Sequence, residues 1–172
     1  MKKLLTIILL LSTTTVFSQH IYKSKGTTSK KVVKKTSSSE SKIKWYTDMN
    51  ESINLSLKTG KPLLLFFTGS DWCGWCKKLQ REVFFKDEFI KWANNKVILV
   101  ELDFPRKSKL PENIQKQNRE LAQNFGVRGY PSIYFVQPKK NSKGIELSAI
   151  GKSGYVAGGP NAWIKAASQY IK

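Results

Sequence analysis

The sequence predicts an α/β domain in which a central mixed β-sheet is flanked by helices on both faces. A continuous apolar run at 62–68 has the composition of a strand that is covered on both faces, and 96–104 is expected to be the second core strand. Helical segments alternate with these strands in the first half of the domain. A β-hairpin and a closing helix follow in the second half, and this order favours a mixed sheet between layers of helices.

The elements of the first half follow from their end signals. Thr47 and Asp48 can cap a helix that runs towards Thr59, and the letters "GKP" stop it. The strand "PLLLFFT" comes next, "GSDW" turns the chain, and a new helix begins near Cys73. Asp87 is expected to cap a second helical piece. The apolar residues of these two helical pieces are Leu79, Val83, Phe84, Phe89, Ile90 and Ala93.

The second half is expected to hold a strand, a helix, a hairpin and a final helix. The strand at 96–104 leads through the polar loop "PRKSKLPEN" into a helix in which Leu121 and Phe125 are four residues apart. The runs "SIYFVQ" and "GIELSAI" flank the loop "PKKNSKG" as a β-hairpin. The final helix carries an apolar face at helical spacing. Its members are Trp163, Ile164, Ala167, Tyr170 and Ile171.

The N-terminal residues have the pattern of an export signal. Residues 1–18 hold a basic start, a mostly apolar run at 4–11 and small residues before a predicted cleavage at their end. The apolar run is about half of the roughly 20 residues that a bilayer span needs. Residues 19–43 are rich in Lys, Ser and Thr and offer little apolar surface to bury, so we expect a flexible linker before a domain at 44–172.

The charge of the chain is strongly basic, with a formal net charge of +18. A basic tail could bind nucleic acid, but an exported protein rarely meets any, so no nucleic-acid partner is expected. Loose contact between the tail and an anionic envelope surface is the favoured interpretation. We expect a bacterial protein that is periplasmic or secreted and acts as a monomer.

Two cysteines, Cys73 and Cys76, lie within "GSDWCGWCKKL" and could form a redox couple, half of a metal site or a structural staple. Zinc needs four ligands, and because the only histidine, His20, lies in the predicted linker, no metal is expected. A staple that closes so short a loop would add little stability. A redox couple is favoured, because a helix start stabilises the thiolate of Cys73. The neighbours Asp71 and Lys77 are expected to face solvent.

The motif "WCGWCK", with Pro131 of "VRGYPS" 55 residues after Cys76, resembles the thioredoxin superfamily. More narrowly, "TGSDWCGWCKKLQREVF" is similar to exported bacterial thioredoxin-like proteins akin to the C-terminal domain of the transmembrane thiol-electron transporter. The likeness covers about residues 44–172. It implies a thioredoxin-like fold and a thiol–disulfide oxidoreductase that needs no cofactor.

The resemblance also implies roles for single residues. Cys73 matches the exposed attacking thiol of a redox-active disulfide, and Cys76 matches the resolving thiol. Pro131 falls where the family has a cis-proline that faces the disulfide, although an ordinary trans proline could also begin a strand there. Trp72 matches a tryptophan beside the pair and could equally be a packing residue. The residues expected to face substrate are Trp72, Trp75, Tyr130 and Pro131.

The sequence departs from the family pattern at two places. Trp75 stands where thioredoxin has a proline before the second cysteine, so the direction of electron flow stays open. The family's buried aspartate is missing from the strand before the motif, where Phe66 and Phe67 lie. Glu101 is therefore a candidate proton acceptor for Cys76, with a solvated carboxylate at the end of a strand as the alternative.

Three functions are compatible with these residues. The first is an extracytoplasmic oxidoreductase that reduces or isomerises protein disulfides and receives electrons from an upstream thiol donor. The second is a thiol oxidase of the same fold. The third is a client-binding module in which the thiols are incidental.

Overall fold

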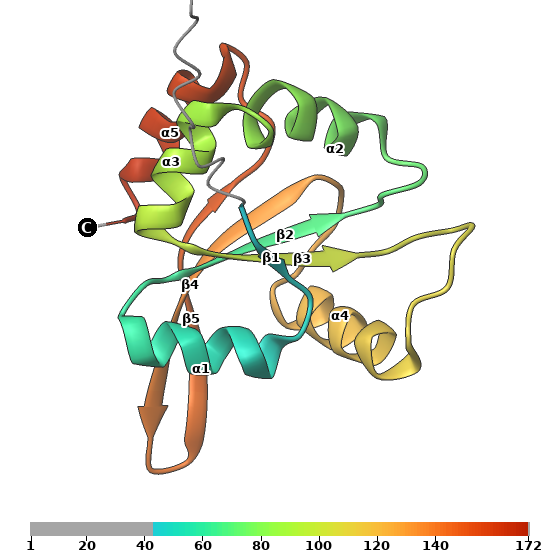
Figure 1. Cartoon of the computed structure of the whole chain (residues 1–172). Helices are drawn as coiled ribbons and strands as arrows, with labels where there is room; N and C mark the ends of the chain where they lie inside the picture. The colour runs from blue at the N-terminus through green and yellow to red at the C-terminus, as the bar shows by residue number, and fades with distance from the viewer. Residues whose placement is uncertain (1–42, 172) are drawn as a thin grey trace, which may run out of the picture. The chain divides into compact units, whose positions relative to one another are not determined.

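A five-stranded mixed sheet organises residues 43–171, which are the residues that the computed structural model describes (Figure 1). The strand order is β1-β3-β2-β4-β5, with β2 at the centre. Strands β1 and β2 both pair with β3 in parallel, whereas β4 pairs with β2 and with β5 in antiparallel fashion. The strands are β1 (Trp45–Tyr46), β2 (Leu63–Thr68), β3 (Ile98–Asp103), β4 (Ser132–Asn141) and β5 (Gly144–Ser153). The predicted signal at 1–18 and nearly all of the predicted linker at 19–43 lie outside the described residues.

Helices cover both faces of this sheet. Figure 1 shows α2, α3 and α5 over one face and α1 and α4 over the other. The helices are α1 (Met49–Thr59), α2 (Gly74–Leu79), α3 (Asp87–Lys96), α4 (Glu112–Asn124) and α5 (Gly159–Ser168), and a π-helical segment, η1 (Gln80–Phe84), continues α2. The predicted fold class is therefore confirmed. No helix within residues 43–171 has both the length and the apolar content that a membrane span needs.

Helix α1 begins and ends at the residues that the sequence indicates. The Asp48 carboxylate accepts a hydrogen bond from the backbone N–H of Glu51 at 2.9 Å and so caps the first turn. Gly60 ends the helix in the left-handed conformation, with a φ of 74°, which a residue without a Cβ adopts easily. The chain then enters β2 directly.

Alternation along β2 sorts its side chains into two cores. Leu64 and Phe66 face the layer of α2, α3 and α5, whereas Leu65 and Phe67 face α1 and α4. The first core is rich in aromatic rings, and Phe84 lies among them. The rings of Phe89, Phe66, Trp45 and Trp163 have centroids between 4.6 and 5.6 Å from that of Phe84. Both cysteines belong to this core.

One element is missing from the predicted order, and one predicted helix cap is wrong. Strand β1 has no counterpart among the predicted elements, because a strand of two residues, Trp45 and Tyr46, is too short to show a periodic pattern. Asp87 is not a cap. Lys86 occupies the cap position in an extended conformation, and Asp87 is the first residue of α3. An acid in this first turn still complements the helix dipole.

The hairpin and the last helix also differ from the prediction. The predicted loop at 138–144 is mostly strand, because β4 continues to Asn141 and β5 begins at Gly144. Its polar residues are tolerated because this end of the hairpin is exposed. Helix α5 ends at Ser168, so the apolar residues at 170–171 pack from beyond the helix.

The first core gives a stability prediction with an adjacent control. Phe84 is fully buried, whereas the next residue, Phe85, is 64% exposed. Phe84→Ala should lower the free energy of unfolding by about 3 to 5 kcal/mol, through lost transfer energy and the cavity it leaves. Phe85→Ala should change it by less than about 0.5 kcal/mol. Urea denaturation measures both, and equal losses would contradict the assignment of this core.

Candidate functional site

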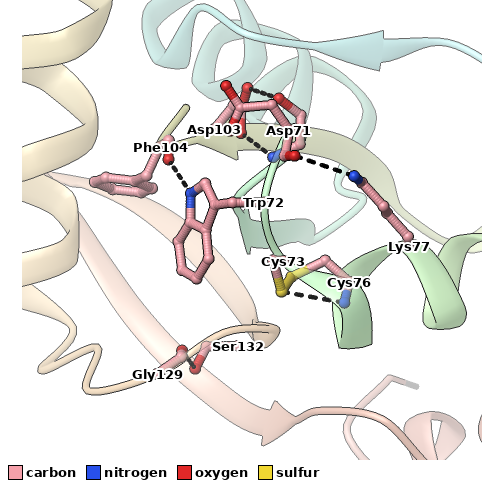
Figure 2. The surroundings of a disulfide bond; sticks show 10 residues. Asp71, Trp72, Cys73, Cys76, Lys77, Asp103, Phe104, Gly129 and Ser132 are labelled. Atoms are coloured by element: carbon pink, nitrogen blue, oxygen red, sulfur yellow. Dashed lines mark hydrogen bonds between the residues drawn. A yellow bond between two sulfur atoms is a disulfide. The ribbon is translucent and has the colours of Figure 1, made fainter. Parts of the chain in front are cut away.

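The cysteines lie where the chain leaves β2 and enters α2. The backbone N–H of Cys73 donates to the carbonyl oxygen of Gly69 at 2.8 Å, which closes the turn. Cys73 is the N-terminal cap of α2, and its Sγ accepts a hydrogen bond from the backbone N–H of Cys76 at 3.2 Å (Figure 2). The helix start therefore directs a donor at the sulfur atom of Cys73.

A disulfide joins Cys73 to Cys76, with an S–S distance of 2.08 Å and a Cα–Cα distance of 5.3 Å. Cys76 has no exposed surface and Cys73 is 5% exposed. The expectation of an exposed Cys73 is therefore wrong for this oxidised form, because the helix and the core cluster cover most of its surface. Cys73 is nevertheless the cysteine that solvent and other molecules can reach.

The segment that leads into β4 lies beside the disulfide. The peptide bond between Tyr130 and Pro131 is cis. Because Ser132 pairs with Phe67 near the end of β2, this segment lies at the sheet edge from which α2 starts. Ser132 Oγ donates to the carbonyl oxygen of Gly129 at 2.7 Å, and Figure 2 shows both residues across from the disulfide. Burial raises the pKa of Tyr130.

Trp72 connects this segment to the loop after β3. Its indole Nε1 donates to the carbonyl oxygen of Phe104 at 2.8 Å (Figure 2). The indole meets the Tyr130 ring edge-on with 5.5 Å between ring centroids, and the guanidinium of Arg106 lies over the indole, 3.9 Å from its ring centroid. A Cβ at Gly69 would come within 2.4 Å of the indole, so this position leaves no room for a side chain. Trp72 thus packs between segments as well as lying beside the disulfide.

Asp71 does not simply face solvent. Its carboxylate accepts backbone hydrogen bonds from Arg106 at 3.0 Å, from Lys107 at 2.6 Å and from Ser108 at 3.3 Å. These hydrogen bonds, led by that from Arg106, hold the pKa of Asp71 below its usual value. Lys77 donates from Nζ to the backbone oxygen of Asp71 at 3.1 Å. Asp71 therefore anchors the loop at 106–108, and we call these contacts the Asp71 anchor. The sequence does not reveal the anchor, because the loop is distant from Asp71 along the chain, although aspartate in a turn often accepts backbone N–H groups.

Glu101 lies on the face of the sheet that carries the cysteines. It is in register with Phe66 of β2 and two residues from Leu99, both of which belong to the cysteine core. Its side chain is half-buried, and burial, followed by the charge of Asp103, raises its pKa. Within residues 43–171, no hydrogen bond joins Glu101 to Cys76.

Trp75, between the cysteines, is 58% exposed. Its ring centroid lies 5.3 Å from that of Tyr155, and the Lys78 ammonium lies 4.9 Å from the first ring and 4.8 Å from the second. Tyr155 donates from its hydroxyl to Glu82 at 2.5 Å. Tyr155 could not be recognised from the sequence as a residue of this site, because only the folded chain brings it next to α2.

The chemistry available here is thiol–disulfide exchange. A disulfide at the start of a helix, with one cysteine that keeps a little exposed surface, can exchange with the thiols of another molecule. No cluster of three metal-binding side chains occurs among the residues that the structure describes.

Comparison with known proteins identifies relatives of this chain. The thioredoxin-like domain family matches residues 49–155. The chain is 34% identical to the disulfide bond reductase DsbH of Chlamydia pneumoniae, over 71% of this chain and 69% of that protein. It is 33% identical to the thioredoxin-related protein DsbJ of the same organism, over 67% of this chain and 32% of that protein.

Solved structures agree on the fold. A structure of a DsbH oxidoreductase superposes with a TM-score of 0.66 at 32% identity, covering 74% of this chain and 83% of that one. A thioredoxin from Thermus thermophilus superposes with a TM-score of 0.55 at 16% identity, covering 74% of this chain and 85% of that one. The second likeness concerns the fold alone.

The Asp71 anchor predicts a pH dependence of stability. A carboxyl whose folded-state pKa is lowered stabilises the fold above the ordinary pKa of about 3.9, and this contribution is lost as pH falls through the folded-state value. Asp71→Asn should therefore be less stable than the parent at neutral pH, and the two should converge in acid. Thermal unfolding from pH 7 to pH 2 measures the difference.

The control for this experiment is Glu120→Gln, which removes the same charge from an exposed ion pair with Lys116. It should differ little from the parent at any pH. A gap between parent and Asp71→Asn that does not change with pH would contradict the anchoring role of the charged carboxylate.

Proposed function

This chain belongs to the thioredoxin-like family, and from that premise we propose that it reduces or isomerises protein disulfides outside the cytoplasm. The chain is a thiol–disulfide oxidoreductase, and the observation that carries this conclusion is the Cys73–Cys76 disulfide at the start of α2. The reducing direction is supported by the relative that is named a disulfide bond reductase.

We assign the attacking role to Cys73 and the resolving role to Cys76. In the reduced protein the Cys73 thiolate attacks one sulfur of a client disulfide, the client S–S bond breaks, and the departing client thiolate takes up a proton. Cys76 then loses its proton and attacks Cys73 Sγ, the bond between Cys73 and the client breaks, and the second client sulfur leaves as a thiolate that takes up a proton. Two electrons pass from the protein to the client, one proton leaves Cys76 and one comes from solvent, and the protein disulfide forms. An upstream dithiol returns the protein to its reduced form by the reverse exchange.

The assignment of roles is supported by accessibility and by the helix start. Cys73 retains some exposed surface whereas Cys76 has none, so a client sulfur can approach the first and not the second. The backbone N–H of Cys76, which now donates to Cys73 Sγ, can stabilise the same atom as a thiolate. Trp72, Trp75, Tyr130 and Pro131 are proposed to border the client chain.

We further propose export as the route to these clients. The basic and then apolar pattern of residues 1–18 supports an export signal. The upstream donor would meet the protein in the same compartment, and loose contact between the basic residues at 19–43 and an anionic envelope surface would keep it there. We propose that the protein acts as a monomer.

Glu101 is proposed as the group that accepts the proton of Cys76. The proposal is supported by its position on the cysteine face of the sheet, by its partial burial and by the raised pKa that burial produces. A carboxylate whose pKa is raised towards neutrality is a better proton acceptor at neutral pH. A bridging water would have to connect it to Cys76 if the two do not come into contact in the reduced form.

The assigned roles are tested with single cysteine variants in insulin reduction. Cys73→Ser should reduce turnover to background, because no accessible nucleophile is left. Cys76→Ser should still attack clients and should trap them as mixed disulfides, which non-reducing gels detect. In the reduced parent, Cys73 should be alkylated faster than Cys76. Equal alkylation rates, or full turnover by Cys73→Ser, would contradict the assignment.

The direction of the reaction is tested by the reduction potential of the cysteine pair. A potential near that of thioredoxin, about −270 mV, supports a reductase, whereas a potential near −120 mV indicates an oxidase. Equilibration with glutathione redox buffers measures it.

The role of Glu101 is tested with Glu101→Gln in single-turnover experiments. Release of the mixed disulfide should slow by about 100-fold or more near neutral pH, whereas its formation by Cys73 should change little. In the parent the release rate should rise with pH through the pKa of Glu101, and this rise should be missing from the variant. Release as fast as in the parent would mean that water accepts the proton.

A stability measurement shows whether Glu101 is buried as described. A raised folded-state pKa favours the fold below the unfolded value of about 4.3, and this benefit is lost as pH rises through the folded-state pKa. The parent should therefore lose stability relative to Glu101→Gln as pH rises. A constant difference between the two proteins would contradict the raised pKa.

A further inference from the structure

We propose that the surface beside the disulfide selects client segments that carry an acidic side chain next to the reacting cysteine. This inference rests on the proposed function, since it concerns the clients of the same cysteine pair. The binding surface consists of Trp75, Lys78 and Arg81 of α2 and η1, together with Gly74, and we call it the α2 hollow. These four residues line a shallow surface hollow of about 340 Å³.

The α2 hollow adjoins the reacting atoms. Gly74 and Trp75 are the two residues between the cysteines, so a client whose sulfur reaches Cys73 must pass beside them. A Cβ at Gly74 would meet no atom within 4 Å, which leaves open space over the helix start. A client side chain next to the reacting cysteine can therefore enter the hollow.

The cation in this hollow is held in place. The ammonium of Lys78 lies 4.9 Å from the centroid of the Trp75 ring and 4.8 Å from that of Tyr155. Cation–π attraction to two rings limits the freedom of a side chain that is otherwise flexible. Tyr155 is itself held by its hydrogen bond to Glu82. Less side-chain entropy is lost when a carboxylate binds a cation that is already ordered.

A second cation near the cysteines is held in the same way. The guanidinium of Arg106 lies 3.9 Å from the centroid of the Trp72 ring. Trp72, directly before Cys73, and Trp75, between the cysteines, thus each carry a cation over the ring. A client chain that reaches Cys73 comes near both cations.

Three carboxylates at the surface near the disulfide, those of Asp71, Asp103 and Glu82, are already engaged by other partners. Asp71 accepts backbone hydrogen bonds from the loop at 106–108, Asp103 accepts from Ser70, and Glu82 accepts from Tyr155. The ion pairs found within residues 43–171 are Lys44–Glu51 and Lys116–Glu120, and neither includes a cation of this surface. The cations beside the disulfide are therefore free to bind a carboxylate from a client.

The chemistry of the hollow fits a glutamate or aspartate within a polypeptide. The exposed indole of Trp75 offers apolar contact to the client chain, and Lys78 and Arg81 supply charge. Paired with exposed cations, a carboxylate gains a modest free energy that salt weakens, and the same charges raise the rate of encounter. A basic residue at the same client position would be repelled.

The experiment uses two peptides, each with one intramolecular disulfide, that differ only by glutamate or glutamine next to one cysteine. Stopped-flow measurements follow their reduction by the reduced protein. At low ionic strength the glutamate peptide should react about three-fold faster, and the difference should shrink at high salt. Equal rates for the two peptides would overturn the inference, whereas turnover of both would leave the proposed function standing.

Single-residue variants show which cation causes the difference in rate between the two peptides. Lys78→Gln should bring the ratio of the two rates towards one, and Lys78→Arg should restore it because the charge is kept. The control is Lys58→Gln on α1, which removes the same charge from the opposite face of the sheet and should leave the ratio unchanged. If Lys58→Gln lowers the ratio as much as Lys78→Gln does, net charge and not the α2 hollow is responsible, and the inference fails.

A binding measurement separates this inference from the proposed reaction. Peptides with serine in place of both cysteines cannot exchange, and they are titrated into the oxidised protein while the indole NMR signal of Trp75 is followed. Tighter binding of the glutamate peptide supports the α2 hollow even if no disulfide is reduced. Equal binding of the two peptides overturns it, whatever the turnover.

Discussion

The central position of β2 in the sheet is the constraint on which the site depends. All six residues of β2 are buried, and the strand is paired on one side with β3 and on the other with β4. Because β2 and β4 run in opposite directions, the end of one meets the start of the other at a single sheet edge. Cys73, which follows β2, therefore comes close to Pro131, which precedes β4, although the two are distant in sequence.

The loop between β3 and α4 depends on the same turn. Asp71 accepts backbone N–H groups of that loop, Trp72 donates to its first residue, Phe104, and Asp103 accepts from Ser70. The contacts of Asp71 and Trp72 are hydrogen bonds to the backbone of the loop, so they fix its position with little regard to its side chains, and the side chain of Asp103 holds the end of β3 to the same turn. Asp71 and Asp103 are used in this way as structural acceptors. Lys78 and Arg106 instead lie over aromatic rings, and neither belongs to an ion pair found within residues 43–171.

The fold and the site could be predicted from the sequence only where neighbouring residues carry the signal. The cap at Asp48 and the apolar run of β2 are encoded by adjacent residues, and the family and fold class predicted from them and from the cysteine motif are confirmed. Strand β1 was missed because two residues show no period. The contacts of Asp71 and Tyr155 were missed because their partners are brought to them only by the folded sheet. Tertiary contacts of this kind leave no mark in a short window of sequence.

At this site the residues that carry out the exchange are separate from the residues that a client contacts first. The two cysteines are almost wholly buried, so the geometry of exchange is fixed by the helix start and by the core beneath it. A client, by contrast, meets exposed side chains such as Trp75 and Arg81, which are not part of the core. Changes among these exposed residues can alter which clients react without disturbing the cysteine pair, because the two sets of contacts share few atoms. Such a site can therefore keep one chemistry while its surface charge determines the proteins on which it acts.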